Sequence, residues 1–260
     1  IHPKLKTPAV TVVFTVLRAG GKFGGGGYKV AGGLHGVGAS VVNALSTHMT
    51  VTVKKGGYIH TDSYERGIPT TELLDGLLPT IGKTRETGTK INFLPDDTIF
   101  DKTWFKEEEV KSRLHETAYL NPGLTIVFED KRKPLKEYVV FHEPDGLIGF
   151  LYDMNRSKEC IHEPIYFKSE AEGITVECAI QYVNEFHENV LGFCNNIYNS
   201  EGGTHLTGFK TSFTTIINSY ARSLGILKDK DPNFNGADVR NGMTAVISIK
   251  HPDPRFEGQT

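Results

Sequence analysis

Apolar and polar positions alternate most regularly between residues 173 and 182. An apolar residue stands at every second position of this segment: Ile174, Val176, Cys178 and Ile180. Polar or small residues fill the positions between them. Because successive side chains of a strand point to opposite faces, this spacing predicts a half-buried β-strand.

A helical spacing of apolar side chains follows between residues 204 and 224. The apolar residues recur every three or four positions: Leu206, Phe209, Phe213, Ile216, Ile217, Tyr220 and Leu224. This stripe predicts a long amphipathic helix with Thr204 as its N-cap. Strands are predicted on either side of it, at 189–194 and 244–250. A strand, a helix and a returning strand predict a right-handed crossover.

The N-terminal half of the chain predicts mainly antiparallel strands. Apolar or alternating runs place strands at 49–55, 58–64 and 89–94, and Gly56-Gly57 predicts a tight hairpin between the first two. β-branched residues at 9–18 favour another strand on propensity alone. The pattern also predicts helices at 40–48 and 103–119 and strands at 124–129 and 137–142. It changes register near residues 142–146, so we expect one domain at 1–143 and a second at 144–260.

Composition indicates a globular protein. Its 260 residues are enough for two domains, and no run of eighteen apolar residues is present, so we expect no membrane segment. A formal net charge of −2 gives no basic face for broad nucleic-acid binding and leaves a local site open. Cys160, Cys178 and Cys194 are widely spaced, which favours reduced, buried thiols in a cytoplasmic protein. Because the first residue is Ile1 and no signal peptide follows, we expect a fragment or a processed chain.

Glycine is concentrated just before the helix predicted at 40–48. Ten of the 21 residues at 20–40 are glycine, and glycine lets a ligand approach the backbone closely. Since the N–H groups of a helix N-terminus bind anions, this stretch predicts a phosphate-binding loop. Interleaved Phe23 and Val30 disfavour the alternative of a flexible linker. His35 is expected either to pack against the loop or to contact phosphate.

Other catalytic and nucleotide-binding motifs are incomplete. Gly82-Lys83-Thr84 lacks the upstream glycine of a P-loop, because Leu77 stands there. The glycines at 33–38 do not follow the dinucleotide-binding order. The histidines form no HExxH motif and no cluster with cysteine, so a metal-dependent hydrolase has no support.

The stretch LRAGGKFGGGGYKVAGGLHGVGASVVNALS resembles the ATP lid and glycine box of type II DNA topoisomerase ATPase subunits. Those subunits belong to a wider family with histidine-kinase, mismatch-repair and heat-shock-chaperone members. The resemblance continues through ETGTKINFLPD (86–96), EGGTHLTGF (201–209) and DPRFEGQT (253–260). It therefore spans the chain. It is strongest to the B-type subunits of bacterial DNA gyrase, with those of topoisomerase IV next.

The resemblance implies an α+β fold in two parts. Residues 1–143 would form the lid and phosphate-loop half of a two-layer α/β sandwich of the gyrase, histidine-kinase and chaperone ATPase type, with the N-terminal part missing. Residues 144–260 would form a transducer domain, truncated at its C-terminus, that resembles a ribosomal-protein domain with a right-handed βαβ crossover. The resemblance also replaces the strand at 9–18 by a helix.

The resemblance further implies an ATP site, with Mg²⁺ as its companion ion. The loop would wrap the phosphates, Thr89 would lie near the adenine, and Gln259 would reach the γ-phosphate from the second domain. The implied ATP-binding residues are Gly21, Lys22, Tyr28, Gly33, Leu34, His35, Gly36, Val37, Gly38, Thr89 and Gln259. ATP hydrolysis by the parent enzyme would drive DNA supercoiling and strand passage. The implied partners are DNA, an A-type gyrase protein and a second copy of the chain, joined through the ATPase gate.

Several departures limit what the resemblance carries over. The family's catalytic glutamate, magnesium-binding asparagine and adenine-binding aspartate are expected upstream of Ile1. No catalytic or metal-binding residue is therefore assigned, and we expect weak nucleotide binding and negligible hydrolysis. Gly67-Ile68-Pro69 spells a tripeptide of that upstream region by coincidence, and Arg18 stands where the family usually has histidine. The carboxylates at 96–97 and 107–109 are expected on solvated surfaces.

Two other functions stay open. The B-type subunit of topoisomerase IV, a decatenating enzyme, shares almost all of these blocks, and a non-catalytic module would use the glycine loop to bind a partner. A mismatch-repair or chaperone relative is disfavoured by the EGGTH and FEGQT blocks. Arg222, Lys228 and Lys230 are expected to be ordinary solvated charges and not DNA contacts.

Overall fold

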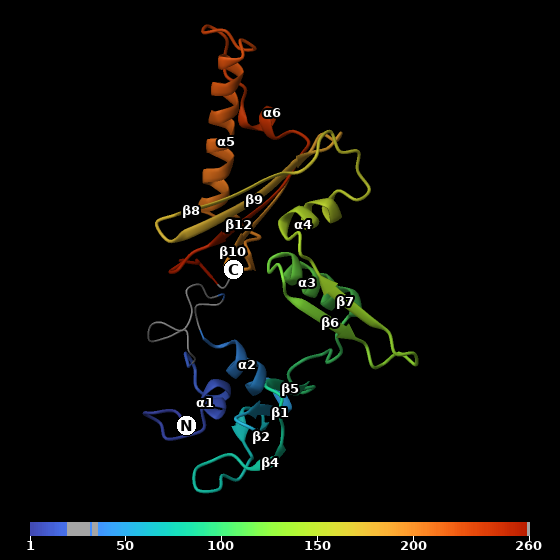
Figure 1. Cartoon of the computed structure of the whole chain (residues 1–260), viewed down its shortest axis with the longest axis vertical. Coiled ribbons are helices and arrows are strands. Elements are labelled where there is room, and N and C mark those ends of the chain that lie inside the picture. The colour runs from blue at the N-terminus through green and yellow to red at the C-terminus, as the bar shows by residue number, and fades with distance from the viewer. Residues whose placement is uncertain (20–31, 33–35, 259–260) are drawn as a thin grey trace. The chain divides into compact units, whose positions relative to one another are not determined.

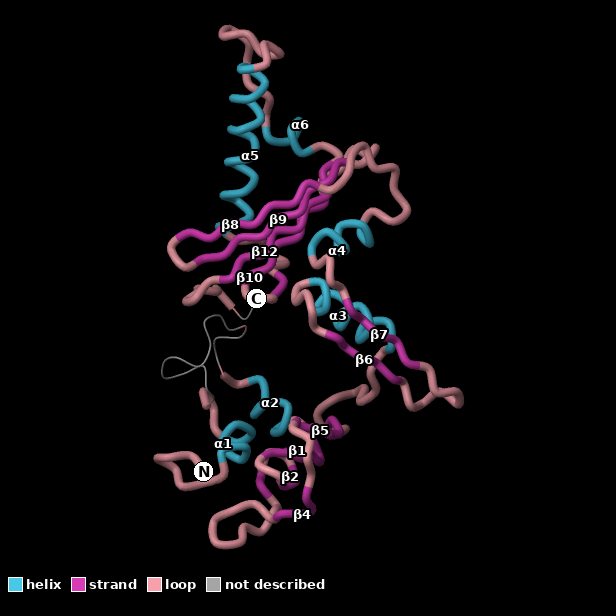
Figure 2. The backbone as a smooth tube through the Cα atoms, viewed as in Figure 1, coloured by secondary structure: helices cyan, strands magenta, loops and turns pink. Residues whose placement is uncertain are grey.

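The computed structural model of the chain describes residues 1–19, 32 and 36–258. The backbone forms two compact units, Ile1–Phe105 and Lys106–Thr260. Each unit has its own sheet (Figures 1 and 2). Each also has its own core of buried side chains. The division between the units lies closer to the N-terminus than the domain boundary expected after residue 143, and that boundary stays a prediction.

The first unit carries two helices on one face of an antiparallel sheet. The strand order is β3-β2-β1-β5, and β4 also pairs with β2. The elements are α1 (Ala9–Thr15), α2 (Gly38–Ala44), β1 (Ser46–Lys55), β2 (Tyr58–Glu65), β3 (Ile68–Pro69), β4 (Thr80–Lys83) and β5 (Gly88–Pro95). The core lies between the helices and the sheet, where Phe14 of α1 packs with Met49, Val51 and Tyr64. We call this the helix-covered face.

The predicted hairpin between β1 and β2 is confirmed. Lys55 pairs with Tyr58 across it, and Gly56 and Gly57 have φ of 64° and 86°. Both positions therefore need the left-handed backbone that glycine adopts freely, as a two-residue hairpin of the primed type requires.

Two predictions for the helices of this unit need correction. The strand favoured by propensity at 9–18 is wrong, and the helix implied by the resemblance is found as α1. The helix predicted at 40–48 ends at Ala44, because Ser46 and His48 pair with β5. Its valines are exposed, whereas its polar positions 40 and 43 are buried.

The second unit contains a five-stranded mixed sheet with the order β11-β10-β12-β9-β8 and a separate β6–β7 hairpin. Its N-terminal elements are α3 (Glu107–Tyr119), β6 (Thr125–Glu129), β7 (Tyr138–His142), α4 (Leu147–Met154), β8 (Ile165–Ala171) and β9 (Ile174–Tyr182). The elements that follow are β10 (Asn189–Cys194), β11 (Ile197–Tyr198), α5 (Thr204–Ser223), α6 (Gly236–Arg240) and β12 (Met243–Lys250). Sequence patterns did not predict α4, β8, β11 or the short α6.

Helices cover both faces of this five-stranded sheet. On one face Cys178 and Ile180 pack with Leu206 of α5, and on the other Ala179 packs with Leu151 of α4 (Figure 1). The strand predicted at 173–182 is confirmed as β9. Its alternation predicted a half-buried strand, but the C-terminal half of β9 is buried on both faces.

The predicted strand, helix and returning strand are confirmed. β10 and β12 run parallel and pair from Asn189–Thr244 to Cys194–Ile249, with α5 between them in the chain. The predicted cap is wrong, because Gly203 is the N-cap and Thr204 is the first helical residue. Of the cysteines, Cys178 and Cys194 are buried as predicted, whereas Cys160 is exposed.

Candidate functional site

Four of the predicted nucleotide-binding residues lie in the described part of the chain: Gly36, Val37, Gly38 and Thr89. All four belong to the first unit. The others lie outside the described residues: Gly21, Lys22, Tyr28, Gly33, Leu34, His35 and Gln259.

The N-terminus of α2 lies directly after the predicted phosphate loop. Val37 precedes the helix, and no side chain of the described residues forms a capping hydrogen bond there. Gly38 begins the helix, and a Cβ added to it would meet no described atom within 4 Å. Uncapped N–H groups beside open space are the arrangement that binds an anion at a helix N-terminus.

Arg18 and Gly36 join the two ends of the segment between them. The Arg18 N–H donates to the Gly36 carbonyl at 3.0 Å. Both residues have left-handed backbone, with φ of 59° and 57°. This conformation is uncommon for arginine and has no steric cost for glycine. The structure therefore gives Arg18 a backbone role at the base of the predicted loop.

Thr89 lies on the helix-covered face of the first sheet. It pairs with Val53, whose side chain packs on the core beneath α1 and α2, and directly opposite residues share a face. Further along β5, Ile91 and Phe93 lie on the same face and are 50% and 40% exposed. On this face β5 therefore presents the Thr89 hydroxyl beside the apolar side chains of Ile91 and Phe93, a combination that suits a flat heteroaromatic ring.

A buried carboxylate that the sequence did not single out holds α1 on the sheet. Asp62 of β2 accepts hydrogen bonds from the Thr11 hydroxyl at 2.5 Å and the Tyr64 hydroxyl at 2.6 Å. Burial, and next the hydrogen bond to Asp62, raises the pKa of Tyr64. The adjacent α2 is tied to α1, because Asn43 Nδ2 donates to the Phe14 carbonyl at 2.9 Å. These bonds hold α1 on the sheet and the C-terminal end of α2 against α1.

Asp96 is buried, so the solvated role expected for it is wrong. Its carboxylate accepts hydrogen bonds from the hydroxyl and N–H of Thr98 at 2.7 and 2.9 Å and from Arg66 Nε at 2.6 Å. The bonds from Thr98 and then from Arg66 lower the pKa of Asp96 to about 2. Asp97 is exposed as expected.

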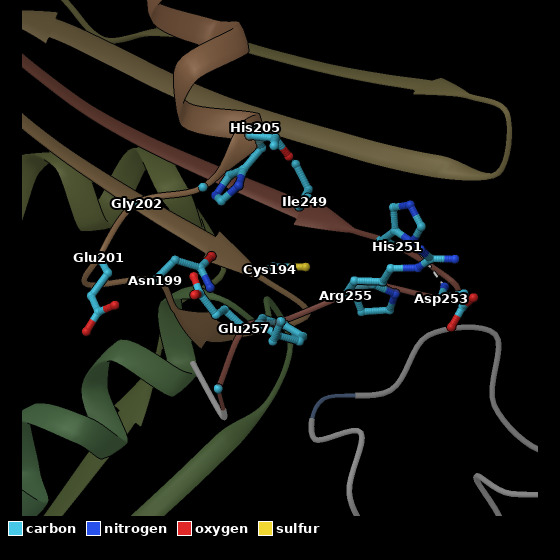
Figure 3. A pocket seen from close by; sticks show the side chains of 15 residues that line it. Cys194, Asn199, Glu201, Gly202, His205, Ile249, His251, Asp253, Arg255 and Glu257 are labelled. Carbon is cyan, nitrogen blue, oxygen red and sulfur yellow. Dashed lines mark hydrogen bonds between the residues drawn. The ribbon is translucent and has the colours of Figure 1, made fainter.

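In the second unit, a cavity of about 1010 Å³ joins two of the sequence blocks (Figure 3). Residues 201–205 line it from the start of α5, and residues 253–258 line it from the segment that follows β12. In the sequence these two blocks lie far apart, and each resembles the topoisomerase ATPase subunits separately. The fold brings them together because β10 and β12 are neighbouring parallel strands and both blocks lie beyond their C-terminal ends.

His205 forms part of the wall of this cavity. Its Nε2 is buried and has no hydrogen-bond partner among the described residues. Burial lowers the pKa of His205 and raises that of Cys194 nearby. Gly203 makes room for the imidazole, since a Cβ there would lie 2.8 Å from the ring. Both shifts favour the neutral form of each group at neutral pH.

Arg222 organises a loop and does not stand as a free charge. Its guanidinium donates to the carbonyls of Lys228 and Asp231 and to Asn233 Oδ1. Within the described ranges, no group of three or more His, Cys, Asp or Glu residues could hold a metal ion. No described helix is both long and apolar enough to cross a membrane.

The chain is similar to bacterial type II topoisomerase proteins. The family model for DNA gyrase B matches residues 146–260. A DNA gyrase B protein from Halalkalibacterium halodurans is 52% identical over 262 aligned positions, which cover 100% of this chain and 40% of the relative. A DNA gyrase B protein from Streptococcus pneumoniae is 50% identical, and the alignment again covers 100% of this chain and 40% of the relative. The chain thus spans about 40% of the length of these curated relatives.

Solved structures share the fold. The 43K ATPase domain of Thermus thermophilus gyrase B, in complex with an aminocoumarin, matches with a TM-score of 0.76 and 32% identity, covering 97% of this chain and 64% of that one. The topoisomerase IV ATP-binding domain of Francisella tularensis, in complex with a small-molecule inhibitor, matches with a TM-score of 0.73 and 28% identity, covering 96% and 64%. These matches confirm the predicted α+β fold class, while the ribosomal-protein likeness of the second unit stays a prediction.

Proposed function

Because the chain belongs to the DNA gyrase B family, we propose that it is an ATP-binding part of a type II DNA topoisomerase. The alignment of the whole chain with gyrase B relatives carries this proposal. The start of α2 supports it, since among the described residues no side chain caps this helix and a Cβ added to Gly38 would meet no described atom within 4 Å. The phosphates of the nucleotide would bind there. The adenine would lie against the helix-covered face near Thr89, whose hydroxyl would contact it partly through water.

The remaining ATP contacts of the proposal come from residues outside the described ranges. Lys22 and Tyr28 belong to the lid, and the glycines and His35 complete the phosphate loop. Gln259 would bond the γ-phosphate, a group that ADP lacks. A contact made with ATP alone gives the two nucleotides different interaction free energies with the protein, which is what a nucleotide-driven conformational change requires.

A magnesium ion accompanies ATP in the proposal. The described residues supply no acidic or histidine cluster for it. No described residue is assigned as its ligand, and no step of the reaction is assigned to it.

The activity of the whole protein extends the proposal beyond this chain. We propose that ATP turnover there drives DNA supercoiling and strand passage in the cytoplasm, with DNA, an A-type gyrase protein and a second copy as partners. The curated relatives named above are gyrase proteins, which favours supercoiling over the decatenation of topoisomerase IV. Supercoiling of relaxed plasmid by the whole protein with its A-type partner tests this choice.

Titration of the 260-residue chain with a fluorescent, non-hydrolysable ATP analogue tests the binding site. We expect a Kd weaker than micromolar for the analogue, and negligible turnover of ATP itself in a separate phosphate-release assay. Thr89→Val removes one hydroxyl with little change in shape and is expected to weaken binding by up to about tenfold, the value of one hydrogen bond. Thr52→Val is the matched control, because Thr52 lies in β1 next to Val53 and therefore points to the opposite face.

Two results would contradict the proposed site. One is the absence of saturable binding at millimolar analogue. The other is an equal loss of affinity in the Thr52 and Thr89 variants, which would place the nucleotide away from the helix-covered face. Sub-micromolar binding or robust turnover would contradict the expected weakness of the isolated chain.

A further inference from the structure

One side chain holds the backbone of the chain where it leaves β12. Asn195 follows β10 directly, and its N–H donates to the Ile249 carbonyl at 2.9 Å. Its side-chain Nδ2 donates to the His251 carbonyl at 2.9 Å, and its Oδ1 accepts from the His251 N–H at 2.8 Å. The side-chain amide thus satisfies both backbone groups of the first residue beyond β12.

Asparagine is suited to this position for two reasons. Asn195 is 2% exposed and has a φ of 51°, and asparagine tolerates left-handed backbone better than most residues. Its amide also presents a donor and an acceptor together, which match the carbonyl and N–H of His251. Aspartate would lack the donor. Glycine would leave both groups of His251 without these partners, which is costly where they are buried.

The chain beyond His251 has little freedom to change direction. The Asp253 N–H donates to His251 Nδ1 at 3.0 Å, and Pro252 and Pro254 restrict φ on either side. Pro254 is buried, and residues 253–258 then line the cavity (Figure 3). The course of this segment up to Gly258 therefore depends on how the backbone is held at His251.

We propose that Asn195 is a positioning residue for the segment 251–258, whose next residue is Gln259. By fixing the backbone at His251, Asn195 sets the course of the segment up to Gly258, the residue before Gln259. This inference rests on the proposed function, in which Gln259 bonds the γ-phosphate. A displacement of about 1 Å in a positioned group can cost about a hundredfold in rate. Loosening the backbone at His251, eight residues before Gln259, is therefore expected to weaken the γ-phosphate contact proposed for Gln259.

Asn195→Gly tests the inference, because it deletes the amide and keeps the left-handed backbone accessible. Asn196→Gly is a matched control. Asn196 is the next residue and has a φ of 66°, but its side chain contacts Asn121 and the Lys250 ammonium. If Asn195→Gly does not fold, Asn195→Asp replaces it, with Asn196→Asp as its control.

The first measurement is the rate of tryptic cleavage after Arg255, which is exposed within the segment. Loss of two hydrogen bonds to one residue predicts cleavage about tenfold faster in Asn195→Gly. The Asn196→Gly rate should stay within about twofold of the unmodified chain, since its side chain does not hold the segment. Equal rates in all three proteins would overturn the inference.

The second measurement is the ratio of the Kd for ADP to the Kd for a non-hydrolysable ATP analogue. The unmodified chain and Asn196→Gly should prefer the analogue, and Asn195→Gly and Gln259→Ala should lose this preference. The double variant should lose no more than either single variant, because the two residues act through one contact. A purely structural role of Asn195 would weaken both nucleotides alike and keep the ratio.

The ratio of the two Kd values distinguishes a failure of the proposed function from a failure of the inference about Asn195. If the unmodified chain does not distinguish ADP from the analogue, the γ-phosphate role of Gln259 fails and the inference fails with it. If the unmodified chain prefers the analogue and Asn195→Gly keeps the full preference, the inference about Asn195 alone is overturned.

Discussion

Asp62 and Asp96 are both buried in the first unit, and the structure satisfies them differently. Asp62 accepts hydrogen bonds from two neutral hydroxyls, those of Thr11 and Tyr64. Asp96 pairs with the Arg66 guanidinium and also accepts hydrogen bonds from Thr98. The hydrogen bonds from Thr98, and next the one from Arg66, lower the pKa of Asp96 to about 2.

Asp96 should make stability depend on acid pH. A carboxyl with a lowered pKa stabilises the folded state above its unfolded pKa of about 3.9, and this contribution is lost as pH falls toward the folded value. We expect Asp96→Asn to lower the urea midpoint at pH 5 and above. The difference from the unmodified chain should shrink progressively below pH 4. Urea unfolding between pH 3 and 7 measures it.

Asp97→Asn is the matched control for Asp96, because Asp97 is the adjacent residue and is exposed. Its urea midpoint should follow that of the unmodified chain across the pH range. A loss in Asp96→Asn that stays constant down to pH 3 would show that the effect comes from packing and not from the charge.

Sequence reasoning at the residue scale predicted the Gly56-Gly57 hairpin turn but missed the buried polar residues. The turn was predictable because two adjacent glycines between two strand patterns are a local signal. Asp62 lies 51 positions from Thr11, and Asp96 lies 30 positions from Arg66. Burial of a carboxylate depends on such distant partners, so no local pattern marks it.

At the scale of elements, α5 packs closely against β10 because Gly192 of β10 has no side chain. Gly192 faces α5, and a Cβ built there would lie 2.6 Å from Leu206 Cδ1. Leu206 is itself buried in the cluster formed by Cys178, Ile180 and Ala245. The close approach of helix and strand therefore requires glycine at position 192, independently of backbone conformation.

Gly192→Ala should destabilise the second unit. The added methyl group overpacks a closed contact, which typically costs about 1–3 kcal/mol. Gly208→Ala is the control within α5, because a Cβ there would meet nothing within 4 Å. Alanine is the better helix former by up to about 1 kcal/mol, so Gly208→Ala should stabilise. Urea unfolding of both variants measures the contrast, and a loss in both would contradict it.

The fate of α1 shows how tertiary structure overrides local propensity. Its β-branched residues favour a strand, yet residues 9–15 form a helix. The helix places Val12 and Phe14 in buried positions and sets the Thr11 hydroxyl against Asp62. β-propensity reflects how well a side chain fits a half-buried position within a sheet. The side chains of α1 are instead buried where the helix packs on the helix-covered face of the sheet.

For the molecule as a whole, the charge of −2 bears on the proposed role of DNA. Nonspecific DNA binding depends on neutralising phosphates with a basic surface. Arg222 is committed to the carbonyls of Lys228 and Asp231. The net charge and the pairing of Arg222 therefore give no support for a broad DNA-binding face on this chain.

The isolated chain should bind duplex DNA only weakly. We expect a Kd of about 10⁻⁴ M or weaker at physiological salt, at the weak end of nonspecific binding. Fluorescence anisotropy with a short duplex across a series of salt concentrations measures it. Replacing Lys228 and Lys230 together by glutamine should change the affinity by less than about twofold. Binding tighter than micromolar, lost in that double variant, would show a local DNA site instead.

The sequence by itself determined the family, the α+β class, and most strands and helices, because these depend on local periodicity and on contiguous motifs. Tertiary structure alone decided which polar groups are buried, where α2 begins, and that residues 201–205 and 253–258 line one cavity. The physical reason is that burial and hydrogen bonding pair residues far apart in the chain. Asn195 and His251, 56 positions apart, meet only because β10 and β12 are parallel neighbours.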